Sequence, residues 1–325
     1  MKQLEISDYR KLNESYHRRL VYHLGIDCGF FVELNYMINA MLYCLANGYR
    51  FLLYSEDANF GTGKGWTEYF LPFCEEVHEP FHHKYNLRRQ SIWRRILAHW
   101  LAFRTYGEYV RLSKDVAHEP DKFYHIPALG ISCSYTEAYA MLARIIWQPQ
   151  PEVQQNMKDA RHRLSLPEIY SGVQIWEGNN ATGSRLISGW QIIQALHPQD
   201  GECIFVLADN YQQLEIVRNE FQKLRIVSLC QPHETGYHHQ AFEHLSPQEK
   251  KESIIRLLIS VDILLQCCAF VGTITSGPSV FLLKVRADDP CVTAIDCPQD
   301  MLPDCLTLNI DERAAISRRF VVRLT

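Results

Sequence analysis

The sequence predicts an α/β fold with a doubly wound parallel sheet in the C-terminal part of the chain. Two observations predict it. Short strands of buried type alternate with helical segments over residues 171–298, and a strand, a glycine loop, a helix and a second strand follow one another near the N-terminus. The composition, 47% hydrophobic and 22% charged, is that of a globular protein.

Five strands are expected in the C-terminal part, with helices between them. The strands are expected at Gly172–Trp176, Cys203–Ala208, Arg225–Leu229, Ala269–Gly272 and Val292–Asp296. The helices are expected at Leu186–Leu196, Leu214–Lys223, Pro247–Leu265 and Val280–Lys284. Because parallel neighbours need a helical crossover, this alternation is typical of a Rossmann-like domain.

The N-terminal part begins with a strand at Val21–Gly25 and a glycine loop from Gly25 to Gly29. A helix follows, with apolar residues at spacings of three and four, and Asn47-Gly48 ends it. Phe51–Tyr54 is expected as a second buried strand. Strand, helix and strand form one βαβ unit, which again implies a parallel sheet.

The remaining N-terminal segments are less regular. Residues 60–85 are interpreted as a long surface excursion, and residues 86–111 as a helix or helix pair rich in arginine. The arginines form either a solvated face or an anion-facing patch. Further helices are expected at Thr136–Gln148 and Glu152–Arg163. The domain boundary should fall between Pro151 and Ser171, which gives an N-terminal α/β domain over 1–165 and a C-terminal domain over 166–325.

Charge and cysteine content exclude several classes of protein. The net charge of −4 disfavours a nucleic-acid partner, and no apolar run is long and uncharged enough for a membrane span. Peripheral association with a membrane stays open. The cysteines, 11 in all, form no CxxC pair and lie mostly in apolar runs, which favours reduced thiols and a cytoplasmic location.

Candidate ligand contacts follow three strands of the expected sheet, because ligands bind at the carboxyl ends of parallel strands. They are Trp176, Glu177, Asn179 and Asn180 after the first strand, Asp209 and Asn210 after the second, and the loop Thr273–Ser279 after the fourth. The small and hydroxyl side chains of this loop, ahead of a helix, suit a phosphate or an ordinary capped helix start. Asp209 is either a ligand for a ribose or sugar hydroxyl or the start of an Asx turn.

No metal site is expected. The histidine-rich stretch from Gln231 to His244 has no zinc-ligand spacing and is interpreted, like His82-His83, as a polar, mobile loop. Walker, nucleophile-elbow and dinucleotide glycine motifs are all absent from the sequence. The absence of the dinucleotide glycine motif argues against hydride-transfer enzymes in particular.

The loops resemble, in order, the motifs of the fucosyltransferase-like superfamily, which includes α1,2-, α1,6- and protein O-fucosyltransferases. The N-terminal glycine loop and its Asn-bearing helix correspond to Gly29, Phe30, Glu33 and Asn35. The family's H-V-R-R-G/T-D-K, A-T-D-D and F-V-G-T-F-S-S motifs correspond to residues 174–180, 207–210 and 270–276. The resemblance implies a GT-B-like pair of Rossmann-like domains, with a donor domain at the C-terminal end and an acceptor side at the N-terminal end.

The resemblance also implies an activity, a glycosyltransferase that transfers a sugar to a glycan acceptor by metal-independent inverting displacement. A nucleotide-sugar such as GDP-fucose is the co-substrate, and no other cofactor is expected. The family's donor-binding arginine falls on Trp176, so Arg185 is expected to supply the missing charge and Glu177 to act as the base. Thr273, Thr275 and Ser276 would hold the phosphates. Gly29, Phe30, Glu33 and Asn35 would face the cleft between the domains.

Two alternatives remain open at this point. The changed first motif also fits a catalytically silent GT-B-like protein that binds a glycan or nucleotide, or that assists another transferase. An unrelated two-domain Rossmann enzyme is the third interpretation.

Overall fold

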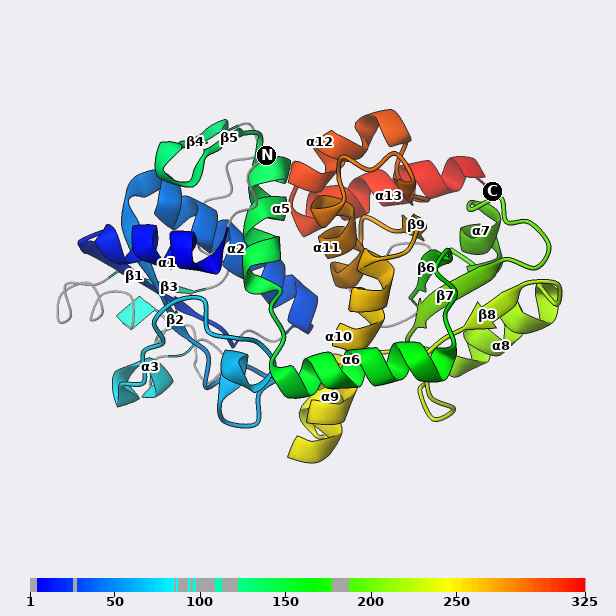
Figure 1. Ribbon diagram of the computed structural model, residues 1–325, viewed down its shortest axis with the longest axis horizontal. Coiled ribbons are helices and arrows are strands. Elements are labelled where there is room, and N and C mark those ends of the chain that lie inside the picture. The colour runs from blue at the N-terminus through cyan, green and yellow to red at the C-terminus, as the bar shows by residue number, and fades with distance from the viewer. Residues whose placement is uncertain are drawn as a thin grey trace. The chain divides into compact units, whose positions relative to one another are not determined.

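The computed structural model describes residues 5–25, 28–84, 86, 93, 96–97, 109–112, 122–176 and 187–324, with 109–112 and 321–324 described by their backbone only. The chain divides into two compact units (Figure 1). Unit 1 comprises Met1–Pro151 and Ser246–Lys251, and unit 2 comprises Glu152–Leu245 and Glu252–Thr325. The acceptor and donor roles expected for the two halves stay predictions.

Unit 1 contains the βαβ unit that the sequence predicts. Strand β1 (Arg18–His23), helix α2 (Phe30–Asn47) and strand β2 (Tyr49–Tyr54) follow one another, and β1 pairs with β2 in parallel. Helix α2 ends at Gly48, whose φ of 66° lies in the left-handed region that glycine adopts without strain. Strand β3 (Tyr109–Leu112) pairs with the other edge of β1, also in parallel.

Two expectations for unit 1 are wrong. Residues 60–85 are not a surface excursion, because Trp66, Tyr69, Phe70 and Phe73 are almost fully buried. Trp66 stacks on Phe70 with ring centroids 4.4 Å apart, so the aromatic rings of this segment form part of the core. The helix expected over 86–111 does not reach its predicted end, since 109–112 belong to β3. The five arginines between residues 88 and 104 lie outside the described residues.

The described part of unit 1 contains further elements. Helices α1 (Ile6–Ser15) and α5 (Tyr135–Ile146) contact each other, and α5 also packs on α2. Ser134 and Glu137 form a capping box at the start of α5. Among the described residues of unit 1, the other elements are 3₁₀ turns at Gly65–Glu68 and Pro127–Leu129, helix α3 (Pro80–Lys84), and an antiparallel pair of β4 (Tyr124–Ile126) and β5 (Ile131–Cys133).

Unit 2 begins in α6 (Pro151–Leu164) and contains the predicted parallel sheet. Its strands are β6 (Ser171–Ile175), β7 (Cys203–Ala208), β8 (Arg225–Val227), β9 (Ala269–Gly272) and β10 (Val292–Ala294). Their order is β10-β9-β6-β7-β8, and every pairing is parallel. This confirms the fold class, since β6 lies in the middle and the chain winds outward from it in both directions.

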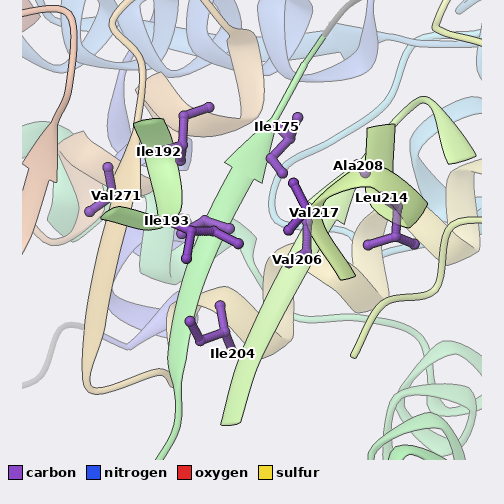
Figure 2. Close-up of a cluster of buried hydrophobic side chains, with 10 residues drawn as sticks. Ile175, Ile192, Ile193, Ile204, Val206, Ala208, Leu214, Val217 and Val271 are labelled. Carbon is purple, nitrogen blue, oxygen red and sulfur yellow. The ribbon is translucent and has the colours of Figure 1, made fainter. Parts of the chain in front are cut away.

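Helices cover both faces of this sheet. On one face, α7 (Gly189–Gln194) and α8 (Tyr211–Glu220) bury isoleucine, valine and leucine side chains against β6 and β7 (Figure 2). On the other face, α10 (Pro247–Leu265) lies so close to β6 that a Cβ at Gly172 would be 2.4 Å from Leu264. Helix α11 (Gly277–Val285) packs against β9 and β10. The branched side chains of the strands fit both layers.

The chain continues with the short helix α12 (Leu302–Thr307), which a 3₁₀ turn at Gln299–Met301 precedes, and with α13 (Ile310–Leu324). The histidine-rich stretch, interpreted as a loop, includes the short helix α9 (His239–Glu243). All eleven cysteines carry free thiols. None of the helices in the described part of the chain is long and apolar enough to span a bilayer.

Candidate functional site

The carboxyl ends of the three inner strands of unit 2 bring one predicted site residue from each strand to one edge. β6 ends at Ile175, with β7 and β9 as its parallel neighbours. Trp176, Asp209 and Thr273 are each the first residue after one of these three strands. Segments far apart in the sequence therefore meet at the edge where α/β sheets bind ligands.

The loop between β9 and α11 is held by two side chains from later in the chain. Asp296 accepts a hydrogen bond from the main-chain N–H of Ile274 through its Oδ1, at 2.8 Å. Arg313 of α13 donates from Nε to the carbonyl of the same residue, also at 2.8 Å. Both main-chain polar groups of Ile274 are thus fixed, which gives the loop one shape. We refer to Asp296 and Arg313 as the Ile274 clamp.

The hydroxyl side chains of this loop differ in burial. Thr273 and Thr275 are half-buried, whereas Ser276 is 2% exposed. Ser276 is the N-cap residue of α11, yet its side chain makes no capping hydrogen bond, and its Oγ has no partner among the described residues. A buried hydroxyl without a partner costs free energy, so a hydrogen-bonding ligand there would relieve that cost.

A buried polar layer lies behind the loop. Ser279 of α11 donates a short hydrogen bond to Gln174 of β6. A Cβ at Gly272 would come within 2.4 Å of the Ser279 Oγ, so glycine is required for this close approach. Burial raises the pKa of Asp296 to about 6, although the N–H of Ile274, Ser317 and Arg313 act in the opposite direction. Burial also lowers the pKa of Lys284 well below its usual value, with the charge of Arg313 as a second cause.

Asp209 and Asn210 organise the next part of the edge. The Oδ2 of Asp209 accepts from the N–H of Tyr237 at 3.0 Å, and its carbonyl accepts from Gly236 at 2.8 Å. Asn210 is the N-cap of α8 and accepts from the N–H of Gln212 at 2.9 Å. Asn210, and not Asp209, therefore forms the Asx turn that caps the next helix. Asp209 instead binds the main chain at Gly236 and Tyr237.

The first motif is only partly visible. Trp176 follows β6 and is half-buried. Glu177, Asn179, Asn180 and Arg185 lie outside the described residues, which stop at 176 and resume at 187. Their roles stay predictions.

The predicted ligand contacts of the N-terminal part make contacts within unit 1. Gly29 is the N-cap residue of α2, and Phe30 is buried among aromatic rings, with its ring centroid 4.8 Å from that of Phe60. Glu33 is fully buried and accepts from the N–H of Gly25 at 3.0 Å. Asn35 accepts a short hydrogen bond from the hydroxyl of Tyr139, between α2 and α5. Whether any of the four meets a ligand stays a prediction.

A cluster of hydrogen-bonded polar side chains lies at the end of β2 in unit 1. The hydroxyl of Tyr54 donates to Asp57 Oδ2 at 2.8 Å, and His83 Nδ1 lies 3.0 Å from Asp57 Oδ1. Behind it, His23 Nε2 and His82 Nδ1 are 2.9 Å apart and both rings are buried. Burial lowers the pKa of His82, which the carboxylate of Glu79 partly offsets. The sequence singled out His82-His83 but not Asp57, because the two segments are far apart along the chain.

Comparison with known proteins identifies the fold. No protein-family model matches the chain, and no curated protein matches it in sequence. Among solved structures, NodZ α-1,6-fucosyltransferase soaked with GDP-fucose is similar, with a TM-score of 0.51 and 10% identity over 82% of this chain and 92% of that one. FUT1 of Arabidopsis thaliana in complex with GDP is also similar, with a TM-score of 0.53 and 10% identity over 90% of this chain and 74% of that one. The chain therefore has the GT-B-like α/β fold of these structures.

Proposed function

We propose that the protein is a glycosyltransferase that takes a sugar from a nucleotide-sugar and transfers it to a glycan acceptor. The observation that carries the proposal is the fold, which the chain has in common with one structure soaked with GDP-fucose and another that contains GDP. GDP-fucose is accordingly the first donor to test. The match of residues 270–276 to the family's third motif supports the same conclusion from the sequence.

In this proposal the nucleotide diphosphate binds at the strand ends of unit 2. The loop 273–276 offers the hydroxyls of Thr273, Thr275 and Ser276, together with main-chain N–H groups at the start of α11. Such groups, with the helix dipole, favour an anion. Arg185 supplies positive charge to the leaving diphosphate, and Asp209 faces the ribose or the sugar.

The proposed reaction is a single inverting displacement without a metal ion. The acceptor oxygen forms a bond to the anomeric carbon, and the bond from that carbon to the diphosphate breaks with its electron pair. The diphosphate therefore needs hydrogen-bond donors, and the acceptor hydroxyl needs a base. Glu177 is the base that the sequence suggests.

Calorimetry with GDP tests the donor site. The parent should bind GDP, and Arg185→Ala should weaken binding about tenfold or more, since a charge-assisted hydrogen bond contributes roughly 1.5–3 kcal/mol. The double variant Thr273→Ala/Ser276→Ala should weaken it as well. If both variants bind GDP as the parent does, the site is misplaced.

Trp176 favours a second candidate function, a catalytically silent protein of the same fold. It stands where the family has its donor-binding arginine, and an indole offers one N–H donor and no charge. Such a protein would bind a nucleotide or glycan, or assist another transferase. GDP binding without turnover of any nucleotide-sugar in a donor panel would favour this candidate.

A further inference from the structure

Two buried cysteines of unit 2 have their thiols in contact. The thiol of Cys297 donates a hydrogen bond to the Sγ of Cys305, with the two sulfur atoms 3.0 Å apart. The side chains are 3% and 1% exposed, and both thiols are free. Because a disulfide joins its sulfur atoms at about 2.0 Å, an approach of about 1 Å separates this pair from a covalent bond.

The segment between the two cysteines lies on the surface. Gln299–Met301 form an exposed 3₁₀ turn, and Pro303 and Asp304 are exposed in the first turn of α12. Only a short helix and a turn therefore cover the two sulfur atoms from this side. Segments with few buried side chains open locally at a small cost in free energy, so a small oxidant can reach the thiols.

The two thiols differ in how readily they lose a proton. Burial raises the pKa of both. In Cys297 the neighbouring Cys305 raises the pKa further, whereas in Cys305 the hydrogen bond from Cys297 opposes the effect of burial. Because the thiolate is the nucleophile, Cys305 should react with an oxidant first, and Cys297 is in place to react second.

The pair lies beside the Ile274 clamp. Cys297 follows Asp296 directly in the chain, and Asp296 accepts from the N–H of Ile274 at 2.8 Å. The charge of Asp296 also raises the pKa of both thiols, which reflects how near its carboxylate is to them. A covalent bond between the two sulfur atoms would therefore fasten the segment that carries Asp296 to α12.

We propose that Cys297 and Cys305 are a redox-sensitive modification site, at which hydrogen peroxide converts two thiols to an intramolecular disulfide. The thiolate of Cys305 attacks one peroxide oxygen, the O–O bond breaks, and the hydroxide released takes up the proton that Cys305 lost. The sulfur of Cys297 then attacks the sulfenic acid, the S–S bond forms, and the S–O bond breaks. Two thiols and one peroxide thus give one disulfide and two waters. The site is independent of the proposed function, since no ligand takes part.

The experiment treats the full chain with hydrogen peroxide, blocks the remaining thiols in denaturant and maps the disulfides by mass spectrometry. Trypsin cleaves after Arg286 and Arg313, so one peptide, 287–313, contains Cys291, Cys297 and Cys305. Fragment ions of this peptide should place a disulfide between Cys297 and Cys305, with the loss of two hydrogen atoms. The disulfide should form faster as the pH rises, because both thiols have raised pKa values.

Cys291→Ser is the matched control, because it removes the exposed thiol of the same peptide and should form the disulfide as the parent does. Cys305→Ser should form none. A thermal melt checks the fold of Cys305→Ser, and the fragment ions of the parent decide the pairing without it. Either a bridge from Cys291, or thiols at 297 and 305 that stay free or become sulfinic acids under peroxide, would overturn the proposal.

The oxidised parent should also melt at a higher temperature than the reduced parent, by roughly 5 °C, because the cross-link closes a short loop in the unfolded chain. Dithiothreitol should reverse this gain. Cys305→Ser should show no gain after the same treatment. Equal midpoints for the oxidised and reduced parent would show that the disulfide does not brace the segment that carries Asp296.

Discussion

The two parallel sheets end in edges of different chemistry. In unit 1 the edge carries ionisable side chains that contact one another, with Asp57 and His83 as the exposed pair. In unit 2 the loop of residues 273–276 offers main-chain groups and hydroxyls, and the Ile274 clamp holds this loop from behind. The same βα architecture thus carries paired ionisable side chains at the edge in unit 1 and a loop of main-chain groups and hydroxyls at the edge in unit 2.

The largest expected effect concerns the backbone of unit 1. Gly65 has a φ of +60°, and a Cβ there would lie 2.2 Å from the carbonyl oxygen of Ser55. Gly65→Ala should therefore cost about 3 kcal/mol or more in the free energy of unfolding, from left-handed strain and from the clash. Gly130 has nearly the same φ, +67°, but open space around it, so Gly130→Ala should cost only about 1 kcal/mol. Urea unfolding of both variants decides, and equal costs would contradict the packing at the end of β2.

The next effect concerns the clamp in unit 2. The pKa of Asp296 is raised to about 6, so the folded state holds a proton that the unfolded state loses near pH 4. Its contribution to stability is thus present below about pH 4 and is lost as the pH rises through about 6, by roughly 3 kcal/mol. Asp296→Asn should remove this dependence. The measurement is the difference in unfolding free energy between parent and variant from pH 4 to 7, and a constant difference would refute the assignment.

Arg313 offers a smaller test of the same clamp. Without its hydrogen bond to the Ile274 carbonyl, the loop loses its fixed shape, and Arg313→Ala should weaken GDP binding about tenfold. Arg319→Ala serves as the control, because that side chain is exposed on the same helix. Calorimetry with GDP compares the three proteins. Equal affinity in the parent and in Arg313→Ala would show that the loop keeps its shape without the clamp.

The smallest expected effect is that of a chelator. The proposed donor site uses N–H groups, hydroxyls and arginine, so GDP affinity and turnover should be unchanged in EDTA. If EDTA lowers GDP affinity or turnover and Mg²⁺ or Mn²⁺ restores it, a metal ion bridges the diphosphate. The proposed metal-free donor site would then be wrong.

The sequence predicted the strands of unit 2 better than the contacts at their ends. Cys203–Ala208 and Ala269–Gly272 have the predicted bounds, because a run of buried apolar residues ends at a polar one in both cases. The sequence does not predict β3. The helical spacing of apolar residues in 86–111 predicts a helix that extends into this strand. The aromatic residues after Gly65 were placed on the surface, because glycines and charges surround them.

The site residues that the sequence missed share one property. Asp296 and Arg313 reach Ile274 from positions 22 and 39 residues later in the chain, and His83 reaches Asp57 from 26 residues away. Local patterns report which residues follow a strand, but not which later side chain will bond to that loop. Such partners depend on strand order and helix packing, which only the folded chain fixes.

The Ile274 clamp also has a consequence for synthesis. A chain emerging from the ribosome completes all five strands of unit 2 with Ala294, yet Arg313 follows later, in α13. The sheet can therefore be assembled while the loop of residues 273–276, where we propose that the diphosphate binds, still lacks one of the two side chains that hold it. Folding of the sheet and shaping of its ligand-binding loop are then separate events. A nascent chain halted before α13 would have a folded sheet but would lack the hydrogen bond from Arg313 to the loop.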